Sequence, residues 1–187
     1  MTGTSTAVAR DVQRLCARLE NGEADGPAFL EQCTRLVAAT VGCSRAGVWV
    51  FRDTVRGRTL HCLALYDGVA DRMTSVEDEA GLHVLTYFQT LEQVGYVMAV
   101  DAQTHFATSG FFNHRLQPNG VRSMLAAGFS VNGRLFGAFT CTQVGRPMEW
   151  SRSQLDALRQ IGHRASLALA SHETRTALDT RPAALFT

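Results

Sequence analysis

The sequence lacks an excess of charge of either sign. Its 18 basic and 17 acidic side chains leave a formal net charge of +1 over 187 residues. Nucleic-acid binding draws most of its affinity from neutralised phosphates, so this balance disfavours DNA or RNA as a partner. The short clusters of one sign, the arginines within 52–58 and the acidic run Glu77–Glu79, are typical of solvated loops.

Paired cysteines and long apolar runs are also missing. The five cysteines are scattered, and none belongs to a CxxC or CxH pattern. An odd number without such spacing argues against a disulfide framework and against a structural zinc site. The N-terminus has no apolar core of a signal peptide, and no run approaches the roughly 20 apolar residues of a membrane span. We therefore expect a cytoplasmic chain that does not enter a membrane.

The common motifs of enzymes are absent as well. The sequence contains no GxSxG, no P-loop, no HExxH and no glycine triplet of a dinucleotide-binding fold. Neighbouring carboxylates occur in Glu77–Glu79, where a loop would not fix their geometry. We predict that the chain is not an enzyme.

Amphipathic helices are predicted near both ends of the chain. Apolar residues recur at three- and four-residue spacing within 8–19 and again within 27–41. Residues 21–27, rich in glycine and polar side chains, separate these two helices. A last helix begins at Ser151, a good N-cap, and carries apolar residues through Leu169.

Strand patterns dominate the middle of the chain. Residues 46–51 are β-branched and aromatic and 59–66 alternate in polarity, which predicts a hairpin. The alternation predicts one shared face for Leu60, Cys62, Ala64 and Tyr66. Farther along, the spacing predicts a helix over 80–94, a short strand over 96–100 and a weak, aromatic helix over 105–116.

The strongest hairpin signal joins 123–131 to 134–144. Asn132-Gly133 lies between them and is the preferred pair for a two-residue turn, because both residues tolerate a positive φ. With hairpins in both halves we predict an α+β fold. It has a mostly antiparallel sheet of about five to six strands, helices on its faces, and N- and C-terminal helices packed together.

Four stretches carry a family likeness. They are 46–51 as the first core strand, Gly120–Leu125 at the entry to the penultimate strand, 132–139 in the last hairpin, and Trp150-Ser151 with the helix end 165–169. Their order and spacing over about 29–170 resemble the GAF domain family of small-molecule-binding and dimerisation modules, with a GAF/PAS-like fold. The likeness is greatest to GAF domains of bacterial two-component and cyclic-di-GMP signalling proteins. One departure is Gly128, where many relatives carry a proline.

The resemblance implies a domain organisation and a ligand pocket. The GAF domain would span 27–172, after an N-terminal helical extension over 1–26 and before a flexible tail over 173–187. Family members bind ligands on the concave face of the sheet, beneath the middle helices. The candidate ligand-binding residues are Tyr87, Phe88, Asp101, Phe106, Phe112, Arg115, Ser123 and Met124. The alternatives are core packing for the aromatic residues and surface ion pairs for the two charged ones.

The sequence leaves the ligand or cofactor unknown. Free methionine-sulfoxide reductases of this fold need clustered reactive cysteines, which are absent here. Bilin-binding members anchor their chromophore through a Cys-His pair, but His61-Cys62 falls in the second strand with its side chains on opposite faces. Haem would need an axial ligand such as His83, His105 or His114, and a lone histidine is more often a surface group, which disfavours haem.

The terminal helices suggest a second role. The apolar stripes of 8–19, 27–41 and 155–169 exceed what the sheet can cover, so we predict a homodimer through a helical bundle. The alternative is that they close the core of a monomer. The predicted function is a ligand-sensing domain of bacterial signal transduction whose output comes from a partner or from an effector domain. Two alternatives are a ligand-free dimerisation scaffold and an enzyme of the sulfoxide-reductase type.

Overall fold

The structure of the protein, a computed structural model, describes residues 2–55, 57–76, 79–80, 84–131 and 133–179. In chain order its elements are α1 (Thr2–Glu20), α2 (Gly26–Val41), β1 (Arg45–Thr54), β2 (Gly57–Asp67), β3 (Arg72–Thr74), β4 (Glu79–Ala80), α3 (Leu85–Val94), β5 (Tyr96–Ala99), the 3-10 helix η2 (Ser109–Phe111), the π-helix η3 (Phe112–Leu116), β6 (Val121–Val131), β7 (Arg134–Val144) and α4 (Arg152–Asp179). None of the described helices is long and apolar enough to cross a membrane.

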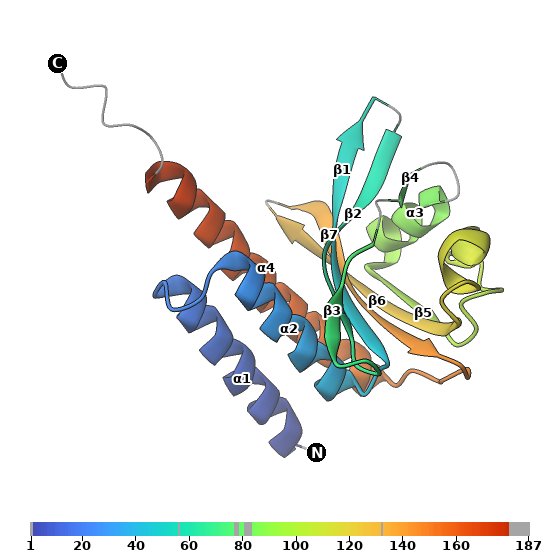
Figure 1. Ribbon diagram of the computed structural model, residues 1–187, viewed down its shortest axis with the longest axis horizontal. Coiled ribbons are helices and arrows are strands. Elements are labelled where there is room, and N and C mark those ends of the chain that lie inside the picture. Colours follow the sequence, from blue (N-terminus) through green and yellow to red (C-terminus); the bar gives the residue numbers. More distant parts are fainter. Residues whose placement is uncertain (1, 56, 77–78, 81–83, 132, 180–187) are drawn as a thin grey trace.

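One antiparallel sheet forms the centre of the fold (Figure 1). Its strands lie in the order β3-β2-β1-β7-β6-β5, and β4 pairs with β2 beside that path. All of these strand pairs are antiparallel. β1 joins the two hairpins, because it pairs with β2 on one side and with β7 on the other. The predicted α+β fold is confirmed.

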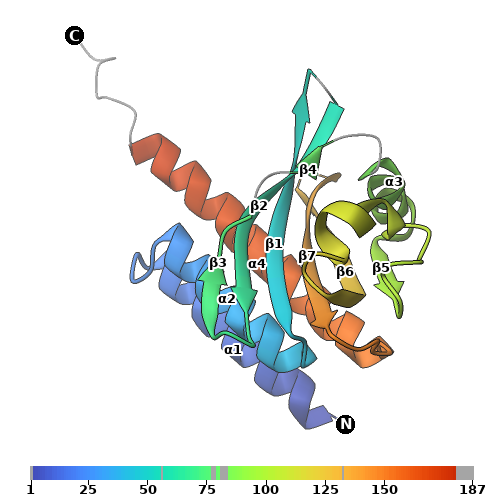
Figure 2. The same ribbon diagram turned by 45° about the vertical axis from the view of Figure 1, so that its right-hand side comes forward.

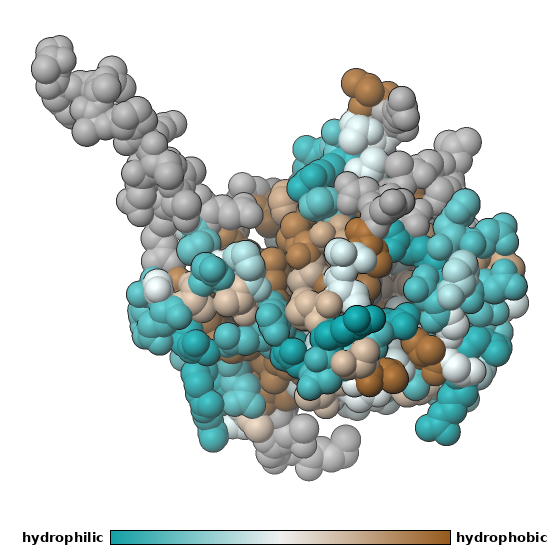
Figure 3. All heavy atoms as spheres, viewed as in Figure 1, coloured by the Kyte–Doolittle hydropathy of each residue, from teal (hydrophilic) through white to brown (hydrophobic). Residues whose placement is uncertain are grey.

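Helices α2 and α4 cover one face of the sheet, and α1 packs against both of these helices (Figures 1 and 2). Asp25 caps α2 by accepting a hydrogen bond of 2.8 Å from the Ala28 amide. Val12 of α1, Val37 of α2 and Ile161 of α4 are buried in one shared core. Hydrophobic residues gather between helices and sheet, whereas the outward side of the helices is hydrophilic (Figure 3). The terminal helices are packed together as predicted.

The opposite face of the sheet carries α3 and the segment with η2 and η3 (Figure 2). Phe88 and Leu91 of α3, Phe111 of η2 and Leu116 of η3 are buried there in a second core. Gly95 ends α3 with a φ of 83°, which lets the chain turn directly into β5. The sheet therefore separates a helical layer from a layer of short, irregular helices.

An extra residue in β2 changes which of its side chains share a face. Consecutive residues of β1 pair with Ala64 and Cys62, so Leu63 has no partner and forms a β-bulge. Leu60 lies in the second core, whereas Tyr66 packs against the helical core. The predicted common face of these strand residues is therefore wrong, because one added residue inverts a period of two.

Two predicted helices differ from the observed elements. The helix over 80–94 is shorter than predicted, because Ala80 lies in β4 and α3 begins at Leu85. Residues 105–116 form turns, a 3-10 helix and a π-helix in place of an α-helix. Their glycine and polar residues weaken helical spacing, so tertiary contacts decide this backbone.

Two further predictions concern segments that the structure describes only in part. The register pairs Val131 with Arg134, which confirms the two-residue connection, while Asn132 itself lies outside the described residues. The predicted tail over 173–187 begins within α4, which continues through Asp179, and 180–187 lie outside the described residues. The domain boundaries stay predictions.

Gly137 tests the close approach of β7 to β1. A Cβ at this position would collide with the carbonyl oxygen of Trp49 and with the ring of Phe129. We expect Gly137→Ala to lower the free energy of unfolding by about 1–3 kcal/mol, because the strands must move apart. Gly26→Ala, at a helix start with open space, is the control and should change it by less than about 1 kcal/mol. Urea unfolding measures both, and equal stability of the two variants would contradict this packing.

Candidate functional site

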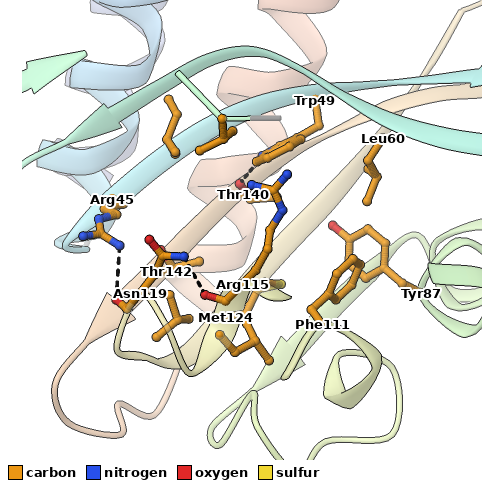
Figure 4. A pocket seen from close by; sticks show the side chains of 14 residues that line it. Arg45, Trp49, Leu60, Tyr87, Phe111, Arg115, Asn119, Met124, Thr140 and Thr142 are labelled. Carbon is orange, nitrogen blue, oxygen red and sulfur yellow. Dashed lines mark hydrogen bonds between the residues drawn. The ribbon is translucent and has the colours of Figure 1, made fainter. Parts of the chain in front are cut away.

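A cavity of about 100 Å³ lies between the sheet and the irregular segment on its second face (Figure 4). Its walls come from β1, β2, β6 and β7 on one side and from α3, η2 and η3 on the other. The lining residues are Arg45, Trp49, Leu60, Leu65, Val76, Tyr87, Phe111, Arg115, Leu116, Asn119, Val121, Met124, Thr140 and Thr142. The lining is mostly apolar with a few polar groups, as in small-molecule sites.

Trp49 forms the sheet side of the cavity. Its indole Nε1 donates a hydrogen bond of 3.0 Å to Oγ1 of Thr140, on the neighbouring strand. A Cβ at position 47 would lie 2.8 Å from that Nε1, so Gly47 leaves the space that the indole needs. The ring is thus held in a fixed orientation, with one face available to the opposite wall.

Arg115 reaches that ring from η3. Its guanidinium carbon lies 5.1 Å from the centre of the Trp49 ring, a cation–π contact. The side chain extends across the cavity toward Trp49 and Thr140 (Figure 4). A π-helix is rare and often marks a functional site. Here its wide turn carries Arg115, and the adjacent Leu116 is buried in the second core.

Tyr87 supplies a buried hydroxyl on the α3 side. The residue is 2% exposed, and its ring packs edge-on against Phe111, with 5.3 Å between ring centres. Its hydroxyl points into the cavity, toward Arg115 (Figure 4). Within the described part of the chain, no residue hydrogen-bonds to this hydroxyl, which faces the cavity. Burial raises the pKa of Tyr87, so the group stays a neutral O–H donor.

Arg45 closes one end of the cavity through an ion pair. Its Nε lies 2.8 Å from Oδ2 of Asp67, and its Nη1 donates to the carbonyl oxygen of Asn119 at 3.3 Å. Burial alone would raise the pKa of Asp67. Hydrogen bonds from Arg45 and from the amides of Ala70 and Val69 hold it below its usual range instead. This network fixes the start of β1 against the loop that leads into β6.

Three of the eight predicted site residues meet in the cavity. Tyr87, Arg115 and Met124 line it, and their role in ligand binding stays a prediction. The other five lie elsewhere: Phe88, Asp101, Phe106, Phe112 and Ser123.

Each of the five has another environment. The ring centre of Phe88 lies 4.9 Å from that of Phe51 in the second core. Asp101 pairs with Arg122, and Phe106 is 67% exposed. Phe112 is half-buried on η3 without lining the cavity. The buried hydroxyl of Ser123 donates to the carbonyl of Val100.

The two described histidines among the candidate cofactor ligands lie outside the cavity lining. His105 is half-buried and accepts a hydrogen bond from the Ala107 amide at Nδ1, and His114 is exposed on η3. Neither lines the cavity, and His83 lies outside the described residues. Over the described ranges, no group of three His, Cys, Asp or Glu side chains gathers as a metal site.

Several lining residues were not predicted from the sequence. Trp49 and Thr140 fall in predicted strands, where alternation alone could have placed them opposite the helix-facing residues Val48 and Phe139. Arg45 gave no such signal, because its position depends on the pairing of β1 with distant segments. The bulge at Leu63 has no signal in the sequence either, so the residues of β2 that face the cavity could not be predicted.

The family model of the GAF domain matches residues 25–169. The chain belongs to the GAF domain family. The cavity therefore lies on the face of a GAF sheet opposite the terminal helices.

Known relatives of this GAF domain come from multidomain signalling proteins. The circadian input-output histidine kinase CikA of Synechocystis sp. is 29% identical over 93 residues, which are 50% of this chain and 12% of that protein. The chain thus spans a small part of that relative's length. The phycocyanobilin-bound GAF domain from a cyanobacterial phytochrome has a TM-score of 0.71 and 17% identity, over 91% of this chain and 96% of that one. The Stigmatella aurantiaca phytochrome photosensory core module has a TM-score of 0.67 and 17% identity, over 93% of this chain and 38% of that one.

The described cavity does not fit a bilin attached through cysteine. All five cysteines of the chain lie in described segments, and none of them lines the cavity. The cavity of about 100 Å³ is also small beside the roughly 300–1,000 Å³ of pockets for larger ligands.

Tyr87→Phe removes the buried hydroxyl and keeps the ring. The hydroxyl makes no hydrogen bond to a described residue, so the ligand-free variant should match the parent in free energy of unfolding within about 1 kcal/mol. Tyr66→Phe is the matched control, because the Tyr66 hydroxyl donates to Asp71 at 2.9 Å and its loss should give no gain. Urea unfolding of ligand-free protein measures both. Clear destabilisation by Tyr87→Phe would contradict the assignment of an unbonded hydroxyl.

Asp67→Asn tests the ion pair at the end of the cavity. The folded-state pKa of Asp67 is lowered, so the charged form stabilises the fold above a pH of about 4 and this contribution is lost as the pH falls through the folded value. We expect the substitution to cost about 1–3 kcal/mol at pH 7 and progressively less below about pH 4. Asp156→Asn, in an exposed pair with Arg152, is the control. A cost for Asp67→Asn that is independent of pH would refute the linkage.

Proposed function

We propose that this GAF domain is a small-molecule sensor of bacterial signal transduction. The observation that carries the proposal is the cavity, where a buried hydroxyl of Tyr87 and the Arg115 guanidinium face an apolar wall. Apolar area supplies affinity in such a site and the polar groups fix the ligand's orientation. The bilin-bound domains with the same fold support a sensory role, and the ligand of this chain is a different molecule if it must fit the described cavity.

The proposed output passes through the terminal helices. Residues of β7 alternate between the cavity, with Thr140, and the helical core, with Phe139 and Cys141. A ligand that alters the spacing between β7 and its neighbouring strands would therefore alter the position of α4 on the sheet. The effector is proposed to be another domain or a protein partner in the cytoplasm, as the histidine kinase and phytochrome relatives suggest. Residues 27–172 are proposed as the GAF unit, with 1–26 as a helical extension.

We propose no catalytic role. Burial and then the nearby Cys16 raise the pKa of Cys33 to about 12, and burial raises that of Cys141. Such thiols stay protonated and react slowly, which speaks against chemistry of the sulfoxide-reductase type. The absence of cysteines from the cavity lining supports the same proposal.

Native mass spectrometry of the protein as purified tests the sensor proposal. We expect a bound small molecule, seen as an excess mass that disappears on denaturation. Met124→Trp, which fills the cavity, should lose that excess because its side chain takes the ligand's place. The absence of any bound molecule, together with a metabolite thermal-shift screen without a hit, would contradict ligand sensing and leave the dimerisation scaffold.

The outer surface of α1 and α4 favours that second role, a homodimer through the terminal helices. Leu167 of α4 is 54% exposed and borders a surface hollow shared with Cys16 and Ala17 of α1. Exposed leucine beside small residues suits contact with a second helix pair. The proposed dimer could serve as a sensor's output surface or as a ligand-free scaffold.

Light scattering at micromolar concentration tests the dimer. We expect twice the mass of one chain, and a shift of Leu167→Glu toward the single-chain mass because a charge would be buried in the contact. Val69→Glu, also exposed but on the loop after β2, should stay dimeric. If the unsubstituted protein has the mass of one chain, the dimer proposal is contradicted.

A further inference from the structure

We infer that the cavity takes an uncharged, largely apolar molecule with about the volume of one aromatic ring. The inference rests on the proposed sensor function and adds the chemical class of the ligand. Three features of the lining carry it: the contacts of its arginines, the balance of its neutral polar groups, and the space that its apolar side chains enclose.

The described lining residues include two charged ones, Arg45 and Arg115, and both are engaged with the chain itself. Arg45 forms an ion pair of 2.8 Å with Asp67, and this carboxylate balances its charge. Arg115 stacks on Trp49, with 5.1 Å between its guanidinium carbon and the ring centre. A charged group of a ligand would have to leave water and then compete with these contacts. An uncharged group avoids that cost.

The neutral polar groups of the lining combine donors with acceptors. The hydroxyls of Tyr87, Thr140 and Thr142 can each donate and accept a hydrogen bond. The Asn119 amide carries both kinds of group as well. Oγ1 of Thr140 already accepts from the Trp49 indole at 3.0 Å. Such a set suits a ligand with one hydroxyl-like group, which also donates and accepts, better than it suits an ion of either sign.

Apolar side chains make up most of the wall and set the size of the ligand. They come from both layers and are Trp49, Leu60, Leu65, Val76, Phe111, Leu116, Val121 and Met124, together with the ring of Tyr87. The cavity measures about 100 Å³. An engineered apolar cavity of about 150 Å³ in another protein binds benzene. The space here therefore corresponds to a single ring with a small substituent.

Aromatic side chains on both sides of the cavity favour a flat ligand. Trp49 lies on the sheet side, and on the other side Tyr87 and Phe111 pack edge-on with 5.3 Å between their ring centres (Figure 4). Ring pairs in stacked or edge-on geometry gain stability beyond their apolar contact. Phenol, one ring with one hydroxyl and no charge at neutral pH, has the inferred properties. Benzoate and benzylammonium carry a negative or a positive charge on the same ring, and 2-naphthol adds a second ring.

Calorimetric titration of the full chain, freed of any co-purified molecule, tests the inference with these four probes. We expect phenol to bind at least about ten-fold more tightly than benzoate or benzylammonium, because each ion loses hydration that the lining does not replace. 2-Naphthol should bind at least about ten-fold more weakly than phenol, because its second ring exceeds the space.

Met124→Ala tests whether phenol binds in this cavity. Met124 is half-buried and lines the cavity from β6, so a shorter side chain enlarges the space. We expect the preference for phenol over 2-naphthol to fall by at least about ten-fold. Met98→Ala is the matched control, because Met98 is half-buried on β5 and packs against the helical core. Its preference should stay within about two-fold of that of the unsubstituted chain, and phenol binding by both variants shows that they are folded.

The ranking of the probes by the unsubstituted chain decides the inference even if a variant fails to fold. Benzoate or benzylammonium binding as tightly as phenol would overturn the uncharged class, and 2-naphthol binding as tightly would overturn the size. An unchanged preference in folded Met124→Ala would place phenol outside this cavity and overturn the inference too. No binding of phenol at about 10 mM would do the same. The sensor function itself is decided separately, by the bound molecule in native mass spectrometry.

Discussion

The fold depends on central strands whose two faces are both buried. In β1 and β7 successive side chains alternate between the helical core and the cavity, so Phe139 and Cys141 face the helices while Thr140 holds the Trp49 indole. Such strands tolerate no slip in register, because a shift by one residue would exchange the two layers. The cavity and the helical bundle are therefore built on the same residues, and neither can move without the sheet.

A second connection between the layers lies where β5 and β6 meet the start of α4. The Ser123 hydroxyl donates to the carbonyl of Val100 and accepts a hydrogen bond of 2.7 Å from the Met148 amide. The Trp150 indole donates to the carbonyl of Ala99 at 3.3 Å. These bonds join the end of β5 and the start of β6 to the segment that leads into α4. A ligand biases such an arrangement only by binding one of two states more tightly.

The sequence was sufficient for the architecture and insufficient for the cavity. Helical spacing and the turn signal before Gly133 predicted the terminal helices and the β6–β7 hairpin, because both depend on neighbours in the chain. The cavity depends on three features without a local signal: the bulge at Leu63, the π-helix that carries Arg115, and the pairing that brings Arg45 to Asn119. Ser123 was among the residues that the resemblance placed in the pocket, yet strand alternation turns its side chain away from that of Met124 and toward Met148.

The central claim is that a small molecule from outside the chain binds in the cavity between the sheet and η3. A crystal structure of the protein as purified, at a resolution that shows individual atoms, tests this claim most directly. The account predicts electron density for a compact molecule beside the Trp49–Arg115 stack. A cavity filled by side chains of the chain itself, with no density for another molecule, would contradict it.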